Sequence, residues 1–220
     1  MSEQTVTVAP EAAVALIAER TRALPGRRVA VGIAGGPGVG KSTIATEVVA
    51  ALNAEASGTA AYLPMDGFHM RHAKLEELGT VKDKGAPHTF EGQAFAEFLE
   101  RLKGTTEDVP GPGYSRAIED VVEDQFVVPA AARVLVTEGN YLLLATAPWW
   151  RVRPLLDLAV FVTVGRDKAR ERLLKRHAEH GLFSEEYIRE HVDQIDLANY
   201  DLVQRSAGRA DVVIELQTEH

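Results

Sequence analysis

A glycine-rich segment of eight residues carries the strongest chemical signal in the sequence. It runs Gly35-Gly36-Pro37-Gly38-Val39-Gly40-Lys41-Ser42 and matches the pattern G-x-x-x-x-G-K-[ST] at every fixed position. Glycines let successive backbone N–H groups point at phosphate oxygens, and the helix expected to follow adds its positive N-terminal end. Lys41 is expected to reach the β- and γ-phosphates, and the Ser42 hydroxyl to ligate Mg²⁺. The segment therefore predicts a phosphate-binding loop (P-loop) for a nucleoside triphosphate, made by Gly35, Gly36, Pro37, Gly38, Val39, Gly40, Lys41, Ser42 and Thr43.

Other interpretations of these glycines are weaker. An ordinary glycine turn stays open, but the clear strand before the segment and the helix after it favour the P-loop. A dinucleotide-binding G-x-G-x-x-G is excluded, because the third glycine would have to stand at position 41, which is lysine.

The second chemical candidate is Asp66, in the stretch Met65-Asp66-Gly67-Phe68-His69. It follows an apolar run, and an acidic residue at the carboxyl end of a parallel strand faces the phosphate site. Asp66 is therefore placed to accept the proton of an attacking hydroxyl, or to orient that hydroxyl. A turn formed by the Asp-Gly pair is the structural alternative. His69 fits two roles equally, contact with a substrate or packing beneath the loop.

A second carboxylate, Glu138, ends the apolar run Val134–Thr137. This placement is typical of a Walker B element, although Glu stands where Asp is usual. Such a carboxylate would hold Mg²⁺ directly or through water. Capping of the next helix or pairing with a lysine is the alternative.

A basic helical stretch is the last candidate, with Arg172 and Arg176 one helical turn apart on one face. In an acidic protein, this face favours a lid over residues 166–182, ending near Gly181, that closes on the transferring phosphate. Taken alone, a charge-rich helix is more often a solvated surface; the P-loop context favours the lid.

These candidates need a scaffold, and the pattern of apolar runs predicts one. Five short apolar runs are predicted as buried parallel strands, at residues 28–34, 60–64, 134–137, 158–164 and 211–215. Helical spacing is found at residues 11–24, 41–53, 92–103, 167–180 and 184–204. The alternation predicts an α/β, three-layer P-loop NTPase fold: a five-stranded parallel sheet flanked by helices. One domain over 1–220 is expected, with 79–129 as an acceptor-binding insertion near the carboxyl ends of the strands.

Composition excludes several classes of function. The net charge of −8 argues against nucleic acid or an anionic membrane as the main partner. Cysteine is absent, which rules out disulfides and thiolate chemistry. The sequence shows no signal peptide and no apolar run of membrane-spanning length, so a cytoplasmic protein is expected. An Asn-Lys-x-Asp motif, which a GTPase would need, is missing, and so is an LSGGQ-like signature of ABC ATPases.

Together these pieces resemble the uridine kinase, phosphoribulokinase and bacterial pantothenate kinase group of P-loop kinases. The resemblance spans Val29 to Glu215. Beyond the P-loop, it rests on Met65–His69, Lys84–Phe90, Tyr114-Ser115-Arg116 and Glu138-Gly139-Asn140. The segment Lys84–Phe90 looks like the K-G-x-P-x-[ST]-[FY] stretch of pantothenate kinases. Its continuation through Tyr114–Asp120 looks closer to a bacterial branch labelled fructose-transport-associated or nucleoside-type kinases.

The resemblance implies roles for individual residues. Asp66 would be the catalytic base, Glu138 would assist the metal, and the segment of Tyr114 and Arg116 would lie by the acceptor. Two departures matter: the uracil-holding element of uridine kinases is shortened to Tyr114–Arg116, and the lid lacks their Arg-Asp…Arg-Gly pattern. The first puts nucleoside specificity in doubt, and the second leaves open which arginine contacts the phosphate. Independently of the family, a solvated loop residue is the alternative for Arg116.

The sequence therefore predicts an ATP- and Mg²⁺-dependent kinase that phosphorylates a hydroxyl of a small metabolite: a sugar, a pantothenate-like compound or a nucleoside. Predicted catalytic residues are Asp66, Lys41, Arg172 and Arg176; predicted metal ligands are Ser42 and Glu138. Predicted acceptor contacts are His69, His88, Thr89, Phe90, Tyr114 and Arg116. The rival is a P-loop ATPase that regulates or chaperones a protein partner.

Three further features stay open at this stage. The acceptor depends on the shape of a pocket that pattern reasoning does not resolve. A homodimer fits the sequence, because Trp149-Trp150 suits either an interface or a core. The adenine pocket has no assigned position, and the segment around Asn199 to Arg209, before the last strand, is the candidate for it.

Overall fold

The computed structural model describes residues 5–180 and 184–217 of the chain. Among these residues, none of the helices combines the length and the apolar character that crossing a bilayer requires.

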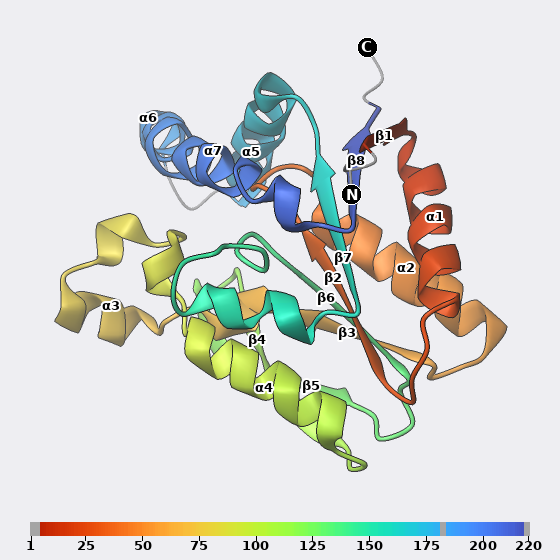
Figure 1. Ribbon diagram of the computed structural model, residues 1–220. Coiled ribbons are helices and arrows are strands. Elements are labelled where there is room, and N and C mark those ends of the chain that lie inside the picture. The colour runs from red at the N-terminus through yellow and green to blue at the C-terminus, as the bar shows by residue number, and fades with distance from the viewer. Residues whose placement is uncertain (1–4, 181–183, 218–220) are drawn as a thin grey trace.

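A parallel sheet of six strands forms the centre of the molecule (Figure 1). Its strands are β1 (Thr5–Val8), β2 (Val29–Ala34), β3 (Ala60–Pro64), β6 (Val134–Gly139), β7 (Leu158–Thr163) and β8 (Val212–Leu216). The strand order is β1-β8-β7-β2-β6-β3, so β2 lies between β6 and β7. Its Val31 is opposite Val136 on one side and Leu158 on the other. Because β2 is buried at every position, the loop after it starts from a rigid base.

The predicted parallel sheet is confirmed, with one strand more than the expected five. The added strand, β1, pairs with β8 at the edge of the sheet. Its four residues, Thr-Val-Thr-Val, alternate between exposed and half-buried positions. A half-exposed edge strand lacks the continuous apolar run by which the buried strands were found.

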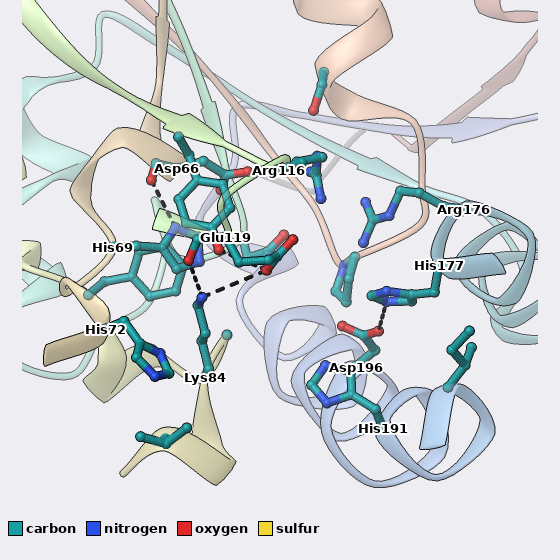
Figure 2. A pocket seen from close by; sticks show the side chains of 18 of the residues that line it. Asp66, His69, His72, Lys84, Arg116, Glu119, Arg176, His177, His191 and Asp196 are labelled. Atoms are coloured by element: carbon teal, nitrogen blue, oxygen red, sulfur yellow. Dashed lines mark hydrogen bonds and ion pairs between the residues drawn. The ribbon is translucent and has the colours of Figure 1, made fainter. Parts of the chain in front are cut away.

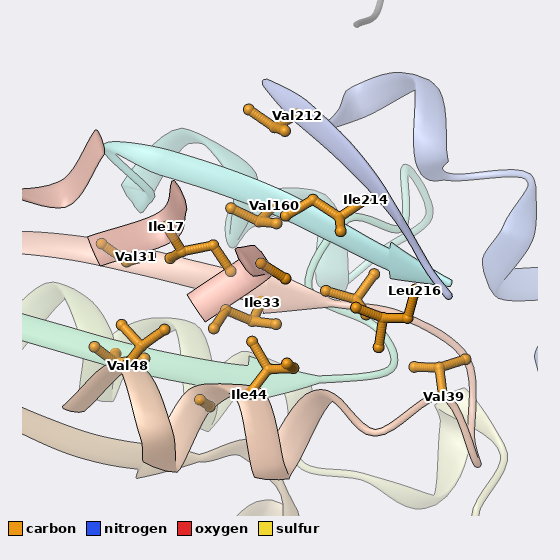
Figure 3. Packing of buried hydrophobic residues seen from close by; sticks show 14 of the residues in the cluster. Ile17, Val31, Ile33, Val39, Ile44, Val48, Val160, Val212, Ile214 and Leu216 are labelled. Carbon is orange, nitrogen blue, oxygen red and sulfur yellow. The ribbon is translucent and has the colours of Figure 1, made fainter. Parts of the chain in front are cut away.

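Helices cover both faces of the sheet, as a three-layer fold requires. On one face lie α1 (Pro10–Arg22) and α2 (Lys41–Glu55); on the other lies α4 (Gly92–Gly104) (Figure 1). Figure 3 shows Ile17 of α1 and Ile44 and Val48 of α2 packed on β2, β7 and β8. Across the sheet, Phe95 and Leu99 of α4 pack in a second cluster that contains the buried Trp149. Trp149 is therefore a core residue, whereas Trp150 is exposed.

Near the carboxyl ends of the strands lie α5 (Arg166–His180), α6 (Glu185–His191) and α7 (Leu197–Gln204) (Figure 1). The helix predicted over 184–204 is divided, because a π-helical turn, Val192–Asp196, joins α6 to α7. Helix α5 lies against the P-loop: a Cβ atom added to Gly38 would be 2.6 Å from the carbonyl oxygen of Ala169. Residues 181 and 182, with which the predicted lid ends, fall outside the described residues.

The segment predicted as an acceptor-binding insertion, 79–129, contains several elements with different surroundings. Helix α4 is part of the layer that covers the sheet, while β4 (Val109–Ser115) and β5 (Asp120–Val128) form an antiparallel hairpin. Before the segment lies the short helix α3 (His72–Leu78). Short 3₁₀ turns complete the chain at Met65–Phe68, Val81–Asp83, Pro87–Thr89, Trp149–Arg151, Arg153–Leu155 and Ala207–Arg209.

Candidate active site

The predicted P-loop connects the end of β2 to the start of α2, which begins at Lys41. Gly38 and Gly40 have φ angles of +78° and +97°, a conformation that residues with a side chain rarely adopt. Lys41 and Ser42 line a cavity of about 320 Å³, near the lower end of the range for small-molecule sites. Burial lowers the pKa of the Lys41 ammonium, and the carboxylates of Glu138 and Asp66 oppose that shift. A bound triphosphate would add negative charge and favour the ammonium form further.

Glu138 lies at the end of β6, next to the P-loop. The Ser42 hydroxyl donates a hydrogen bond to Glu138 Oε1 at 3.1 Å, and the Tyr62 hydroxyl donates one to the same oxygen at 2.9 Å. Burial raises the pKa of the Glu138 carboxyl, while Lys41 acts in the opposite direction. A hydroxyl and a carboxylate side by side are the oxygen donors that Mg²⁺ prefers. The two residues therefore fit the predicted metal site, and Tyr62 is an orienting residue that the sequence analysis missed.

Asp66 lies in the 3₁₀ turn directly after β3, and its side chain lines the same cavity as Lys41 and Ser42. Its carboxylate is 3.8 Å from the guanidinium of Arg116, which comes from the β4–β5 connection. The following residue, Gly67, lies against β4: a Cβ atom there would be 1.9 Å from the Pro112 carbonyl oxygen. The Asp-Gly pair therefore fits both interpretations given from the sequence, a turn and a site residue. The glycine permits a close backbone contact, and the aspartate lines the cavity.

His69 packs within a stack of aromatic rings. Its ring centroid is 3.9 Å from that of Phe90 and 4.5 Å from that of Tyr114. Its Nδ1 atom is 2.8 Å from the carbonyl oxygen of Asp66. Burial lowers the pKa of the imidazole, and the contact with the Asp66 carbonyl oxygen is a hydrogen bond when Nδ1 carries a proton. His69 lines the cavity, and its contacts also anchor the backbone that carries Asp66.

The residues predicted to contact the acceptor separate into two groups. Phe90, Tyr114 and Arg116 line the cavity together with His69. The other two predicted contacts, His88 and Thr89, are not among its lining residues. His88 is exposed and pairs with Asp83 at 3.1 Å, and Thr89 is buried with its hydroxyl bonded to the carbonyl oxygen of Ala86 at 2.8 Å. These two consecutive residues thus make contacts within the loop, whereas Phe90, the next residue, lines the cavity.

The two arginines of the predicted lid also have different surroundings. Arg176 lines the cavity, whereas Arg172 donates a hydrogen bond from Nη1 to the Val39 carbonyl oxygen in the P-loop at 3.1 Å. Within the described residues, Arg176 Nε and Asn140 Oδ1 are buried without a hydrogen-bond partner. Buried polar atoms without partners are rare in folded proteins, and here two of them belong to residues that line the cavity.

Several residues that line the cavity were not predicted as site residues. They are His72, Val81, Lys84, Gly85, Glu119, Asn140, His177, Tyr187, Ile188, His191 and Asp196. Lys84 lies 3.7 Å from the Glu119 carboxylate, and the Tyr114 hydroxyl donates a hydrogen bond to Glu119 at 2.9 Å. Figure 2 shows Asp66, His69, Lys84 and Glu119 on one side of the cavity and Arg176, His177 and Asp196 on the other. Lys84 and Asn140 stand in motifs that carry the resemblance; the histidines have no local pattern that marks them.

The region predicted to hold adenine lies beside the site. Asn199 donates a hydrogen bond to the carbonyl oxygen of Gly85 at 3.2 Å. Tyr200 packs against Gly36 of the P-loop, where an added Cβ atom would be 2.7 Å from its ring. The adenine position itself stays a prediction.

In this parallel sheet the inner strand β2 leads through a P-loop into a helix, and carboxylates lie at the ends of β6 and β3, the two strands on one side of β2. This is the arrangement of a P-loop kinase. The match to known proteins gives the family: residues 30–220 match the model of the phosphoribulokinase/uridine kinase family, and the chain belongs to that family.

Individual relatives agree with this assignment. A protein of Schizosaccharomyces pombe named "Putative uridine kinase" is 34% identical over 86% of this chain and 83% of its own length. A pantothenate kinase of Latilactobacillus sakei is 30% identical over 66% of this chain and 48% of its own length. A crystal structure titled "putative fructose transport system kinase", from a Silicibacter species, has a TM-score of 0.83 at 32% identity. It covers 91% of this chain and 98% of its own. The family resemblance expected from the motifs is confirmed.

Proposed function

We propose that this protein is an ATP-dependent kinase that transfers the γ-phosphoryl group to a hydroxyl of a small metabolite. The observation that carries the proposal is the position of Asp66, whose side chain lines the same cavity as Lys41 and Ser42. A carboxylate beside a P-loop lysine places a proton acceptor next to the expected position of the γ-phosphate. The relatives named as uridine, pantothenate and fructose-transport kinases support a small-molecule acceptor, such as a sugar, a pantothenate-like compound or a nucleoside.

In the proposed reaction, the acceptor oxygen forms a bond to the γ-phosphorus as the bond to the β-phosphate oxygen breaks. The acceptor proton passes to Asp66, and ADP carries the electrons of the broken bond. Lys41 and Arg176 stabilise the negative charge on the phosphoryl oxygens. The proposed metal ligands are Ser42 and Glu138, and Mg²⁺ when bound would supply charge neutralisation and orientation of the phosphates.

The proposal for the acceptor side assigns Tyr114, Arg116 and Phe90 to the pocket wall that selects the substrate. A cavity of about 320 Å³ suits a metabolite more than a protein segment. The mixture of Arg116 and Lys84 with Asp66 and Glu119 is typical of a site for a polar compound.

Replacing Asp66 with Asn tests the base assignment. The substitution keeps the size of the side chain and removes its ability to take a proton, so turnover should fall about 10²–10⁴-fold. Binding of a non-hydrolysable ATP analogue should stay within a few-fold of wild type in calorimetry. An Asp66→Asn variant with full kcat would refute the assignment.

Finding the acceptor comes first. A thermal-shift screen of sugars, nucleosides and pantothenate, with the ATP analogue present, should show stabilisation by one chemical class through mass action. The rival function, a P-loop ATPase that regulates a protein partner, predicts hydrolysis stimulated by protein and no requirement for a carboxylate at position 66. If no metabolite shifts the melting temperature or accelerates ADP release, the rival gains support.

A further inference from the structure

A cluster of two imidazoles and one carboxylate lies in the wall of the cavity formed by α5, α6 and the π-helical turn. It consists of His177, His191 and Asp196, and none of these residues has a part in the proposed phosphoryl transfer (Figure 2). We propose that this cluster binds a transition-metal ion of the Zn²⁺ class and joins the lid helix α5 to the helices after it. This site is separate from the proposed Mg²⁺ position at Ser42 and Glu138.

The geometry of the cluster matches a shared metal ion. One ligand atom from each side chain lies within 4.8 Å of the others. His177 Nε2 and Asp196 Oδ2 are 2.9 Å apart, and two ligands about 2.0–2.1 Å from one Zn²⁺ ion in tetrahedral geometry stand roughly 3.3 Å apart. The His191 imidazole makes no hydrogen bond to any residue that the structure describes, although its ring is 5.6 Å from that of His177. A small change in side-chain rotamers would therefore let all three reach one ion.

The π-helical turn explains how His191 and Asp196 come to the same face. Residues five apart in a regular α-helix point about 140° away from each other. Here the backbone N–H of Leu197 bonds to the carbonyl oxygen of Val192, five residues earlier, which widens the turn. Such insertions in helices often mark functional positions. The turn brings Asp196 toward His191 and His177, a grouping that an uninterrupted helix would not make.

The chemistry of the donors selects the kind of ion. Imidazole nitrogen suits Zn²⁺, Co²⁺, Ni²⁺ and Cu²⁺, whereas Mg²⁺ and Ca²⁺ prefer oxygen ligands alone. The Asp196 carboxylate disfavours an anion at the same place. Three protein ligands with an open position toward a cavity is the pattern of zinc sites that keep an exchangeable ligand.

Charged residues near the cluster affect how tightly it would bind a metal ion. Arg176 interacts electrostatically with Asp196 and with His191, and its positive charge opposes a second cation nearby. Glu119 acts in the opposite direction on both Arg176 and His191. We therefore expect micromolar binding, weaker than that of closed structural zinc sites.

Cobalt(II) titration of the untagged full-length protein, in excess Mg²⁺, tests the proposal. Co²⁺ replaces Zn²⁺ with similar ligands and reports its surroundings through visible absorption bands. We expect one Co²⁺ per chain, displacement of the bands by Zn²⁺, and a rise in melting temperature with Zn²⁺. His177→Gln, His191→Gln and Asp196→Asn should each weaken Co²⁺ binding at least about tenfold. Circular dichroism should show that each variant is folded.

Two variants serve as controls. His88 forms a similar pair with Asp83, at 3.1 Å on the surface, but no second histidine joins it within the described part of the chain. His88→Gln should therefore leave the bands and the affinity unchanged. Glu138→Gln should also leave them unchanged, because it alters the proposed Mg²⁺ position alone. Absence of the bands, or equal affinity in wild type and all three cluster variants, would overturn the proposal. Neither result depends on whether the protein is a kinase, since no turnover is measured.

Discussion

At the scale of single residues, the cavity is organised by opposite charges held close together away from water. Burial alone would neutralise both Lys41 and Glu138, because it disfavours their charged forms. Each charge favours the other, and the Ser42 and Tyr62 hydroxyls donate hydrogen bonds that favour the Glu138 carboxylate. The site thus brings an amine and a carboxyl group together in one small volume, where each charged form supports the other against the effect of burial.

The two arginines of the predicted lid provide a test at this scale, because their contacts differ. Arg176 lines the cavity with a buried Nε that has no partner in the described residues, so its guanidinium is available to the phosphoryl group. Arg176→Ala should lower kcat about 10³-fold, the lower end of the effect of catalytic arginines. ATP-analogue binding should change far less.

Arg172→Ala is the matched variant, one helical turn away. Its Nη1 atom holds the Val39 carbonyl oxygen, and a hydrogen bond from a charged group contributes about 1.5–3 kcal/mol. Its loss should weaken binding of the ATP analogue by roughly tenfold or more, with a smaller effect on kcat. Calorimetry and steady-state kinetics on both variants separate the roles. A large loss of kcat in Arg172→Ala with unchanged nucleotide affinity would contradict this division.

At the scale of elements, the acceptor side of the cavity depends on how closely β4 approaches the 3₁₀ turn that carries Asp66. Gly67 makes that approach possible, because a Cβ atom would be 1.9 Å from the Pro112 carbonyl oxygen and 2.6 Å from its carbon. These are backbone atoms, so no side-chain rotation can relieve the contact. The hairpin that carries Tyr114 and Arg116 is thereby fixed relative to the proposed base.

Gly67→Ala should therefore displace the hairpin and disturb the site. We expect a loss of about 1–3 kcal/mol in the free energy of unfolding, the usual cost of overpacking. Turnover should fall as well, because Asp66 and Arg116 lose their relative position. Gly104→Ala, at the end of α4 where an added Cβ atom meets nothing within 4 Å, is the control. It should be neutral or slightly stabilising. Urea unfolding of the two variants gives both values, and equal stability would contradict the packing argument.

The same contact shows where prediction from sequence ends. The five buried strands and the P-loop were predictable, because continuous apolar runs and a fixed glycine spacing are local properties. Asp66 and Glu138 followed from the rule that strand ends face the ligand. In contrast, β1 is a half-exposed edge strand, and the proline- and glycine-rich sequence of β4 does not read as a strand.

The direction in which side chains point was the other feature that the sequence did not predict. Nothing in the order His88-Thr89-Phe90 indicates that Phe90 lines the cavity while the two residues before it make contacts within the loop. The cluster of His177, His191 and Asp196 needs α5, α6 and the π-helical turn to be packed together before its residues meet. Such long-range groupings have no pattern in a single sequence.

At the scale of the whole molecule, the site is built into the packing, so the state of buried titratable groups affects folding. His69 lies between Phe90 and Tyr114 and is anchored to the Asp66 carbonyl oxygen. Burial lowers the pKa of its imidazole; Lys84 and Arg116 act in the same direction, and the Asp66 carboxylate opposes them. The net effect leaves the folded pKa below the value of 6.5 in a free imidazole.

This shift gives the free energy of unfolding a predictable dependence on pH. Because the unfolded chain takes up the His69 proton more readily, the stabilisation is fully present above pH 6.5. It is lost as pH falls through that value toward the folded pKa. His69→Phe keeps an aromatic ring in the stack and removes the titration. Between about pH 8 and pH 5, urea unfolding should show a smaller loss of stability in this variant than in wild type. The difference between the two proteins at about pH 8, where both rings are uncharged, measures the cost of the substitution itself. Parallel pH profiles for the two proteins would show that burial of His69 does not couple protonation to folding.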